Sequence, residues 1–486
     1  MKPFQPYRKP ALPKRFPPLV LWALPLGALL LWCLLSLWLG RWEGQPPELS
    51  LDRDFTALGE NPSLVLEVED AQSGLRQLSA VLEVEGRSFA LVDRSYPEPW
   101  LLFFQRSGSQ SSARFDLGAM IAASHQIREG PARLSVTARD HSYRRFFGGN
   151  RARLQQDFTF DLRPPTVQPL SGQHYITQGG SACVVYRVGE DTEISGVRVG
   201  SDFFPGYAAD PGGDKQVRFC IFGYRYDLGP DPEMKLVAVD AAGNRSEARF
   251  QTKLFPKKFR QRTIRLSPAF LQQVVPAILN ENPRLSSQGD LVKDFLQING
   301  GLRQANHETI KQLSSRSEPR FLWTEAFAQL SRSKVESLFA DHRTYLYEGR
   351  EIDRQDHVGF DLSVVKHYPI EASNDGLVRY ADLLGIYGNT ILLDHGCGLF
   401  SLYGHLSSIA VQAGDPVSKG QVLGRSGATG LAAGDHLHFG LFLHGIPVNP
   451  TEWWDPKWVR ERVLDRIREH TGGSAPAGSR SERNQP

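Results

Sequence analysis

The strongest constraint on how this chain of 486 residues can fold is a stretch without any charged side chain, from Phe16 to Gly40. Its central part, Leu19 to Leu39, is long and apolar enough to cross a bilayer core of about 30 Å as a helix. A secretory signal peptide has only ~7–15 apolar residues and ends at a small-residue cleavage site, which the sequence Leu-Gly-Arg-Trp-Glu does not offer. We therefore expect an uncleaved transmembrane helix at residues 17–40.

The charges on the two sides of this stretch differ in sign. Residues 1–16 contain five basic residues and no acid, and the first acid of the chain is Glu43. By the positive-inside rule, the basic tail of residues 1–16 lies in the cytoplasm and everything after the span lies outside. The expected protein is anchored in the membrane by one N-terminal span.

Length and charge limit the number of domains and the kinds of partner that the rest of the chain can have. A chain of 486 residues is too long for one core and predicts about three domains of ~100–200 residues each. With 41% hydrophobic and 22% charged residues, most of the chain is expected to fold. The net charge of +3 is too weak to indicate a polyanionic partner, so nucleic acid is excluded.

Residues 47–163 and 164–255 form a weak internal repeat. Each copy begins near a Pro-Pro pair, continues with an alternating apolar strand and an acidic turn containing Ser-Gly, and ends in a strand followed by an Asp-containing turn. This alternation is typical of antiparallel β-sandwiches. We expect two tandem sandwich modules that resemble bacterial immunoglobulin-like domains in pattern and act as spacers, with ligand binding as the alternative role.

The four cysteines do not indicate a disulfide framework. Cys33 lies in the expected span, and Cys397 lies in an apolar hairpin pattern that favours a buried thiol. Cys183 and Cys220 are candidates for one bridge in an oxidising compartment, and the sequence leaves open whether they form it.

Residues 264–338 show apolar residues at spacings of three and four, which predicts a helical connector. Ser267 and Pro268 supply an N-cap and a first-turn proline. We expect Pro276 and the Asn299-Gly300-Gly301 stretch to divide the connector, and a further helical stretch from Thr324.

Residues 339–456 carry the residues of a candidate active site. His436 and His438 stand at the start of an expected strand, where residues two apart point to the same face. His357 and Asp361 are four residues apart with Gly359 between them, so a bend can bring both onto one ion. Two histidines and one carboxylate are the protein ligands of many catalytic zinc sites, with a fourth position left for water. Such a water has a pKa near 7 and suits amide hydrolysis.

The order of these blocks matches a known family. Residues from Phe339 to Asp455 contain HVGFDL, NDGLVRYA, YGNTILLDHGCGLFSLYGHL, VQAGDPVSKGQVLGRSGATG and GDHLHFGLFLHGIPVNP. This succession resembles the lysostaphin/LytM-type zinc metallopeptidases, which cleave peptidoglycan peptides. The resemblance implies an antiparallel β fold with a groove over the metal.

The resemblance also implies a role for each site residue. It assigns His357, Asp361 and His438 as zinc ligands, and His405 and His436 as the catalytic pair beside the metal. Imidazoles in such positions can relay a proton and stabilise an oxyanion. The family has an acid after HLHF, where this chain has Gly440, so we expect a change in ligand orientation or substrate fit.

The expected protein is mainly β, with one transmembrane helix, two β-sandwich modules, a helical connector and an antiparallel β catalytic domain. Residues 457–470 have helical spacing and predict a terminal helix, and residues 471–486 have the composition of a disordered tail.

The expected function is that of a Zn²⁺-dependent endopeptidase of peptidoglycan cross-link or stem peptides. The protein would sit in the bacterial cytoplasmic (inner) membrane with its catalytic domain on the outer, periplasmic side. The alternative is a non-catalytic scaffold or activator of other cell-wall hydrolases, and envelope or division proteins are possible partners under either function. Residues 285–320, which include His307, are candidates for a segment that occupies the open metal position and keeps the enzyme latent.

Overall fold

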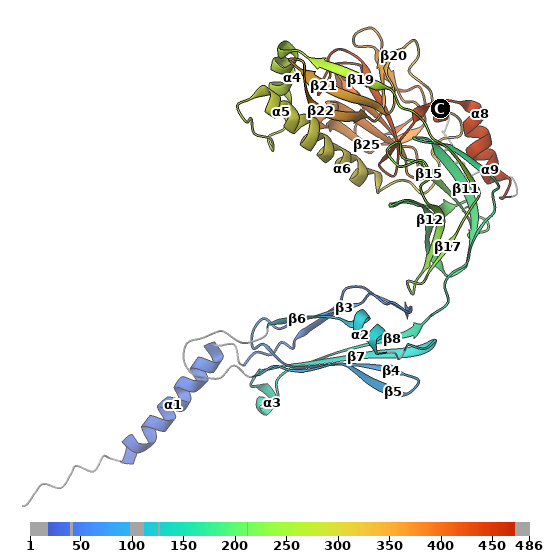
Figure 1. Cartoon of the computed structure of the whole chain (residues 1–486). Coiled ribbons are helices and arrows are strands. Elements are labelled where there is room, and N and C mark those ends of the chain that lie inside the picture. Colours follow the sequence, from blue (N-terminus) through green and yellow to red (C-terminus); the bar gives the residue numbers. More distant parts are fainter. Residues whose placement is uncertain (1–17, 39–41, 98–110, 125–126, 211, 472–486) are drawn as a thin grey trace, which may run out of the picture. The chain divides into compact units, whose positions relative to one another are not determined.

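The structure is a computed structural model that describes residues 18–38, 42–97, 111–124, 127–210 and 212–471. Strands dominate these residues, so the chain is mainly β as predicted. The chain divides into two compact units, Met1–Arg163 with Ala241–Asn244 and Pro164–Asp240 with Arg245–Pro486 (Figure 1). The predicted cytoplasmic tail, residues 1–16, and the predicted disordered tail from residue 472 onward lie outside the described residues.

Helix α1 spans Pro18–Trp38 and contains Pro25. Within the described part of the chain, no helix combines the length and the hydropathy that crossing a membrane requires. The predicted transmembrane helix is therefore not supported.

The first unit contains two sheets, in which all strand pairs are antiparallel except β2 with β8, and one shared core. Buried side chains of both sheets, among them Leu66, Leu82 and Leu134, belong to the same apolar cluster. The three-stranded sheet consists of β1 (Glu48–Leu51), β3 (Val65–Glu69) and β6 (Ser112–Asp116). The five-stranded sheet consists of β2 (Ala57–Leu58), β8 (Arg151–Phe160), β7 (Gly130–Asp140), β4 (Leu75–Val84) and β5 (Arg87–Ser95). Two short helices, α2 (Leu117–Ala123) and α3 (Arg144–Phe147), complete this unit.

The second unit begins with two four-stranded sheets and one small pair of strands. The first sheet consists of β14 (Tyr207–Ala208), β15 (Val217–Gly223), β11 (Ser181–Val188) and β9 (Val167–Pro169). The second consists of β13 (Asp202–Pro205), β12 (Thr192–Val199), β16 (Met234–Asp240) and β17 (Arg245–Ala248), and the pair is β10 (His174–Thr177) with β18 (Thr252–Phe255). The immunoglobulin likeness of both modules stays a prediction.

Cys183 and Cys220 are both free thiols, so the candidate bridge is absent. In the β11–β15 ladder, Cys183 pairs with Ile221 and Val184 pairs with Cys220. Because neighbouring residues on a strand point to opposite faces, the two sulfur atoms lie on opposite sides of the sheet.

The connector contains a strand and three helices with an inserted π-helix. They are β19 (Gln261–Leu266), α4 (Pro268–Glu281), α5 (Leu291–Gln297), the π-helix Ile298–Leu302 and α6 (Arg303–Ser314). Ser267 caps α4 as predicted, because its Oγ accepts a hydrogen bond from the Phe270 amide at 3.1 Å. Two predicted divisions are wrong: α4 continues through Pro276, and the Asn299-Gly300-Gly301 stretch stays helical as the π-helix.

The helix predicted from Thr324 is also absent. Its backbone amides bond to distant carbonyls instead, Phe327 to Trp453 at 3.0 Å and Ala328 to Ser373 at 2.8 Å. Phe327 is buried in the core. Tertiary contacts therefore keep this segment out of a helix until β20 begins at Lys334.

The sheet that carries the candidate site has eight strands. It consists of β20 (Lys334–Ser337), β23 (Phe360–Ser363), β31 (Leu437–Leu443), β27 (Leu399–Leu406), β26 (Asn389–Asp394), β25 (Gly376–Leu383) and β29 (Pro416–Val417), with β32 (Ile446–Val448) paired to β31. A second sheet consists of β24 (Pro369–Glu371), β30 (Val422–Arg425) and β28 (Ser408–Ile409). A third consists of β19, β21 (Asp341–Tyr347) and β22 (Arg350–His357).

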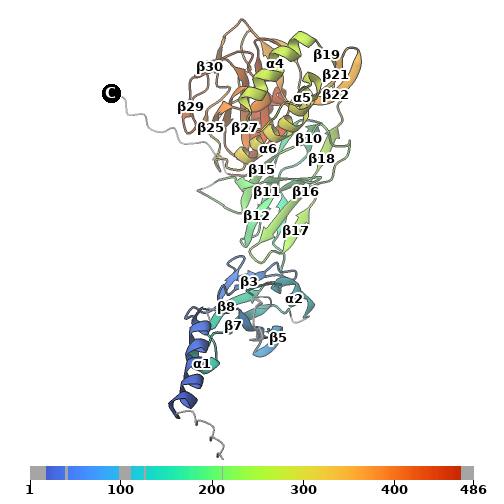
Figure 2. The same ribbon diagram turned by 90° about the vertical axis from the view of Figure 1, so that its left-hand side faces the viewer.

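The connector helices cover one face of the large sheet. Figure 2 shows α4, α5 and α6 in front of β25 and β27. Their buried residues Leu271, Phe295 and Ile310 share a core with Leu402 of β27 and Phe442 of β31. The connector thus packs on the sheet that carries the candidate site.

The terminal segment predicted as a helix is helical in three short pieces. They are α8 (Pro456–Val459), the π-helix Arg460–Leu464 and α9 (Asp465–Arg468), and they follow α7 (Pro450–Trp453). Arg466 donates hydrogen bonds to the Cys183 and Gln173 carbonyls, both at 3.2 Å. These pieces therefore connect the end of the chain to the second sandwich module.

Candidate metal centre

Three strands bring together the residues predicted as zinc ligands. His357 ends β22, Asp361 lies in β23, and His438 lies in β31 directly opposite Asp361 in the ladder. Gly359 sits in the bend between the first two, where a Cβ would come within 2.6 Å of the Phe439 carbonyl and 2.7 Å of His438 Nε2. Only glycine allows this close approach.

The three donor atoms lie close to one another. His357 Nε2 is 2.9 Å from Asp361 Oδ1 and 3.0 Å from His438 Nδ1, and His438 Nδ1 is 3.0 Å from Asp361 Oδ1. His357 and His438 are buried. Donors at these separations fit one ion bound at about 2.0–2.2 Å from each of them.

The chemistry of these donors also fits a cation. His357 Nδ1 is 3.0 Å from the Leu338 carbonyl, which can only accept, so Nδ1 carries the proton and Nε2 presents a lone pair. That lone pair faces a carboxylate oxygen and a second imidazole nitrogen. Buried lone pairs that face one another are stabilised by a positive charge between them, so these residues are suited to hold a metal ion.

The electrostatics of the site keep its ligands in metal-binding forms. Burial lowers the pKa of His438 to about 4, and burial likewise lowers the pKa of His357. Burial works to raise the pKa of Asp361, but its interactions with His357, His436 and His438 outweigh it and hold this pKa well below the usual range. Neutral imidazoles and an ionised carboxylate are the forms that bind zinc.

Arg343 of β21 holds the other oxygen of the carboxylate, a contact that the sequence analysis missed. Its Nη2 donates to Asp361 Oδ2 at 2.8 Å. The side chain is only 17% exposed. With Oδ2 engaged by Arg343, Asp361 offers Oδ1 alone to a metal.

His405 and His436, predicted as the catalytic pair, lie beside the three donors. Their ring centroids are 4.8 Å apart, and His436 Nε2 is 3.5 Å from Asp361 Oδ1. Each Nδ1 lies close to a backbone carbonyl, at 2.8 Å from Thr429 O for His405 and at 2.7 Å from Gly434 O for His436. Each Nδ1 therefore donates, which leaves Nε2 of each ring to accept a proton.

The two rings differ in their environments. Burial holds the pKa of His405 well below its usual range. At His436 burial also works to lower the pKa, but the hydrogen bond and charge of Asp361 outweigh it and raise the pKa. The backbone of His405 has φ +62°, a left-handed conformation that costs about 1–3 kcal/mol in a non-glycine residue and is typical of functional sites.

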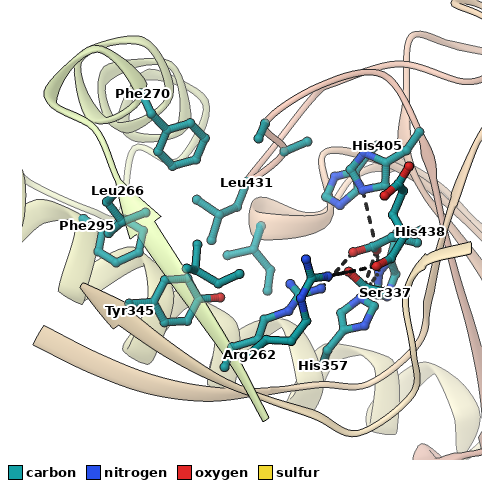
Figure 3. Close-up of a pocket in the computed structure, with 18 of the residues that line it drawn as sticks. Arg262, Leu266, Phe270, Phe295, Ser337, Tyr345, His357, His405, Leu431 and His438 are labelled. Atoms are coloured by element: carbon teal, nitrogen blue, oxygen red, sulfur yellow. Dashed lines mark hydrogen bonds and ion pairs between the residues drawn. The ribbon is translucent and has the colours of Figure 1, made fainter. Parts of the chain in front are cut away.

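A pocket of about 670 Å³ opens over these residues. Figure 3 shows His357, His405 and His438 at one end, and Leu266, Phe270 and Phe295 at the other. β19, α4, α5 and α6 contribute to the wall of this pocket, so the connector shapes the space next to the candidate metal site.

His307 does not reach the donor atoms. Its Nε2 is 2.9 Å from the Tyr387 hydroxyl, and the Tyr387 ring packs against His438 at 5.3 Å between centroids. The structure therefore places His307 behind the site, and the hypothesis that the segment around it occupies the open metal position is wrong for this conformation.

Gly440, the departure from the family pattern, has a packing reason. Gly440 pairs with Leu402 in the β27–β31 ladder, and a Cβ there would come within 2.8 Å of the Phe442 ring. An acidic side chain at this position would enter an apolar cluster, so glycine suits the core of this chain.

Comparison with known proteins identifies the family that the residues around the candidate site match. The model of peptidase family M23 matches residues 355–450, which include all five predicted site residues. The chain is 39% identical over 94 residues to the DD-carboxypeptidase/endopeptidase Mpg of Neisseria meningitidis serogroup B, which is 19% of this chain and 22% of that protein. It is 40% identical over 93 residues to the peptidoglycan DD-endopeptidase ShyA of Vibrio cholerae, again 19% of this chain and 22% of that protein. The chain thus spans about a fifth of the length of these relatives.

Among solved structures, the catalytic domain of lysostaphin from Staphylococcus simulans is 27% identical to this chain. The match covers 27% of this chain and 98% of that domain, with a TM-score of 0.23.

Proposed function

We infer that this chain, which carries a peptidase family M23 domain at residues 355–450, is a zinc-dependent endopeptidase that hydrolyses amide bonds in peptidoglycan peptides. One observation supports this most: the two imidazoles and the carboxylate converge within 3.0 Å of one another beside two further histidines, at one end of an open pocket.

His357, Asp361 and His438 are the residues that would hold the zinc ion. Bound there, zinc would supply Lewis-acid polarisation and a water of lowered pKa. His405 has a fixed tautomer, since Nδ1 donates to Thr429, and its Nε2 is free to accept a proton from the attacking water. His436, near the Asp361 carboxylate, can hold a proton at Nε2 and donate a hydrogen bond to the oxyanion that develops on the scissile carbonyl.

Mass spectrometry of muropeptides tests this function. The purified whole chain, supplied with zinc, should release new amino termini from peptidoglycan, and the cleaved bond follows from the product masses. A chelator should abolish the release and added zinc should restore it. If the protein carries about one zinc ion per chain and still releases no new amino termini, the enzyme function is wrong.

Two variants make this test specific. His405→Ala should keep its zinc and lose activity by about 10²- to 10⁴-fold, the range of positioned general bases. His367→Ala is the matched control, because His367 lies in the same domain with a side chain that is 63% exposed and outside the pocket. It should cleave like the native chain. A non-catalytic scaffold would instead show no difference among the three proteins.

We also propose that the catalytic domain works on the outer side of the bacterial cytoplasmic membrane. The proposed substrate lies there, and the basic residues before the charge-free stretch favour this orientation. Alkaline phosphatase fused after residue 471 should be active in cells, because this enzyme folds only after export. An inactive fusion in a chain that is produced in full would contradict the placement.

A further inference from the structure

Two arginines stand side by side on the wall of the pocket. β19 and β21 pair in parallel, and Arg262 is the register partner of Arg343. Both side chains line the pocket that holds the candidate metal ligands. Figure 3 shows Arg262 at the metal end of this pocket, near His357 and Ser337.

The charges of this pair are only partly compensated. Arg343 is paired with Asp361, but Arg262 donates through Nη1 to the Glu336 carbonyl and the Ser337 hydroxyl, both at 2.9 Å and both neutral. Like charges directly opposite one another on neighbouring strands are destabilising. Asp361 is also a donor to the candidate metal, so a bound cation would leave the pocket with a larger excess of positive charge.

The remaining charges of the pocket do not remove this excess. Arg265 and Arg303 also line it, whereas its second carboxylate, Glu336, is engaged by Lys334 at 2.8 Å. Arg262 and Arg343 both precede residues 355–450, so they lie outside the part of the chain that the family model matches.

We propose that Arg262 and Arg343 form a subsite for a free carboxylate of the peptide substrate, next to the amide bond that is cut. The proposal rests on the proposed peptidase function and adds its substrate class, which is a peptide with an ionised carboxyl group on a residue adjoining the scissile bond. A guanidinium binds a carboxylate through paired N–H groups, and Arg262 keeps donors beyond Nη1 for this purpose.

Two synthetic peptides test the subsite. They are identical except that the residue beside the scissile amide carries a free carboxylate in one and a carboxamide in the other. The native whole chain with zinc should have a kcat/KM about 10- to 100-fold higher for the carboxylate peptide, as expected for one charge-assisted contact. Arg262→Gln should bring the ratio of the two kcat/KM values close to one through the KM of the carboxylate peptide, and Arg262→Lys should restore part of it.

The ratio separates recognition from folding, because a partly unfolded variant loses activity on both peptides equally. Lys258→Gln removes an exposed charge ahead of β19 that does not line the pocket, and it should keep the native ratio. A native chain without preference, or an Arg262→Gln variant with an unchanged ratio, would overturn the subsite and leave the peptidase function intact.

If neither peptide is cut, the proposed function fails. The subsite is then tested by measuring how tightly the chain binds the two peptides. Calorimetry with the native chain should then still show about 10-fold tighter binding of the carboxylate peptide, and this difference should vanish in Arg262→Gln. Equal affinities of the native chain for the two peptides would dismiss the subsite as well.

Discussion

At the scale of single residues, the candidate metal centre is oriented by contacts that face away from the metal. His357 Nδ1 donates to the Leu338 carbonyl, and Asp361 Oδ2 accepts from Arg343. Such contacts fix the tautomer of an imidazole and the orientation of a carboxylate. The geometry of the donors therefore depends on Arg343, which lies outside every sequence block that identified the site.

Replacing Arg343 by glutamine should weaken metal binding. Without the guanidinium, Asp361 can rotate or bind with both oxygens, and loss of such a supporting contact costs about 10- to 100-fold in metal affinity. Competition for zinc with a chromophoric chelator measures this loss without any need for catalysis. Arg354→Gln, which changes an arginine on the outer surface of β22, is the control and should bind zinc like the native chain. Unchanged affinity in Arg343→Gln would refute the supporting role.

Short spacings in the sequence were enough to predict that some residues of the candidate site lie close together. The same-face placement of His436 and His438 follows from strand alternation, and the bend at Gly359 follows from glycine. Arg343 and Arg262 could not be found in this way. Arg262 lies beside Arg343 through the pairing of β19 with β21, and Arg343 reaches Asp361 of β23 from that sheet. An isolated arginine carries no signal for such a pairing.

At the scale of elements, one short turn links helix α6 of the connector to the candidate site. The 3₁₀ turn Gly385–Tyr387 lies under α6, and Asn306 Oδ1 accepts the Ile386 amide at 2.9 Å. Gly385 has φ +44°, and a Cβ there would come within 2.5 Å of Asn306. Tyr387 at the end of this turn packs on His438, so α6 supports the metal site through the turn.

Asn306→Ala should destabilise the second unit by about 1–3 kcal/mol, because it leaves the buried Ile386 amide without its acceptor. Chemical denaturation of the whole chain, followed by tryptophan fluorescence, measures the change. Gln304→Ala is the matched control, since Gln304 is an exposed residue on the same helix, and it should change stability by less than about 0.5 kcal/mol. Equal stability of both variants would show that α6 does not depend on this contact.

Helix prediction failed where the backbone found partners far along the chain. The residues after Thr324 have helical spacing, yet Phe327 and Ala328 bond to Trp453 and Ser373. Local periodicity reports which residues are apolar, but not whether their neighbours lie in the same helix or in another part of the chain. The break predicted at Pro276 is wrong for a different reason. The packing of Val274, Val275 and Ile278 keeps α4 continuous through this proline.

At the scale of the whole molecule, the second sandwich module and the domain that carries the candidate metal centre form one unit. Phe219 of the module packs on Phe321 at 5.1 Å between ring centroids, and Trp453 Nε1 donates to Ser181 Oγ at 3.2 Å. One buried apolar cluster includes residues of both. The sequence did not predict this shared core, because alternation along a strand does not reveal what its buried face packs against.

Glu452 makes this junction sensitive to pH. Its carboxylate accepts the Ser181 amide at 2.7 Å, and burial raises its pKa from 4.5 to about 7. An acid with a raised pKa in the folded state stabilises the fold below its unfolded pKa, and this stability is lost as pH rises from about 4.5 to 7.

Glu452→Gln should therefore be more stable than the native chain at pH 8, by about 1–3 kcal/mol, with little difference at pH 4.5. The comparison is made in chelator-containing buffer, which removes metal binding as a variable. Thermal unfolding across this range measures the difference, and Glu461→Gln, on the nearby surface, is the control that should follow the native curve. A Glu452→Gln curve parallel to the native one would show that this carboxyl does not link the junction to pH.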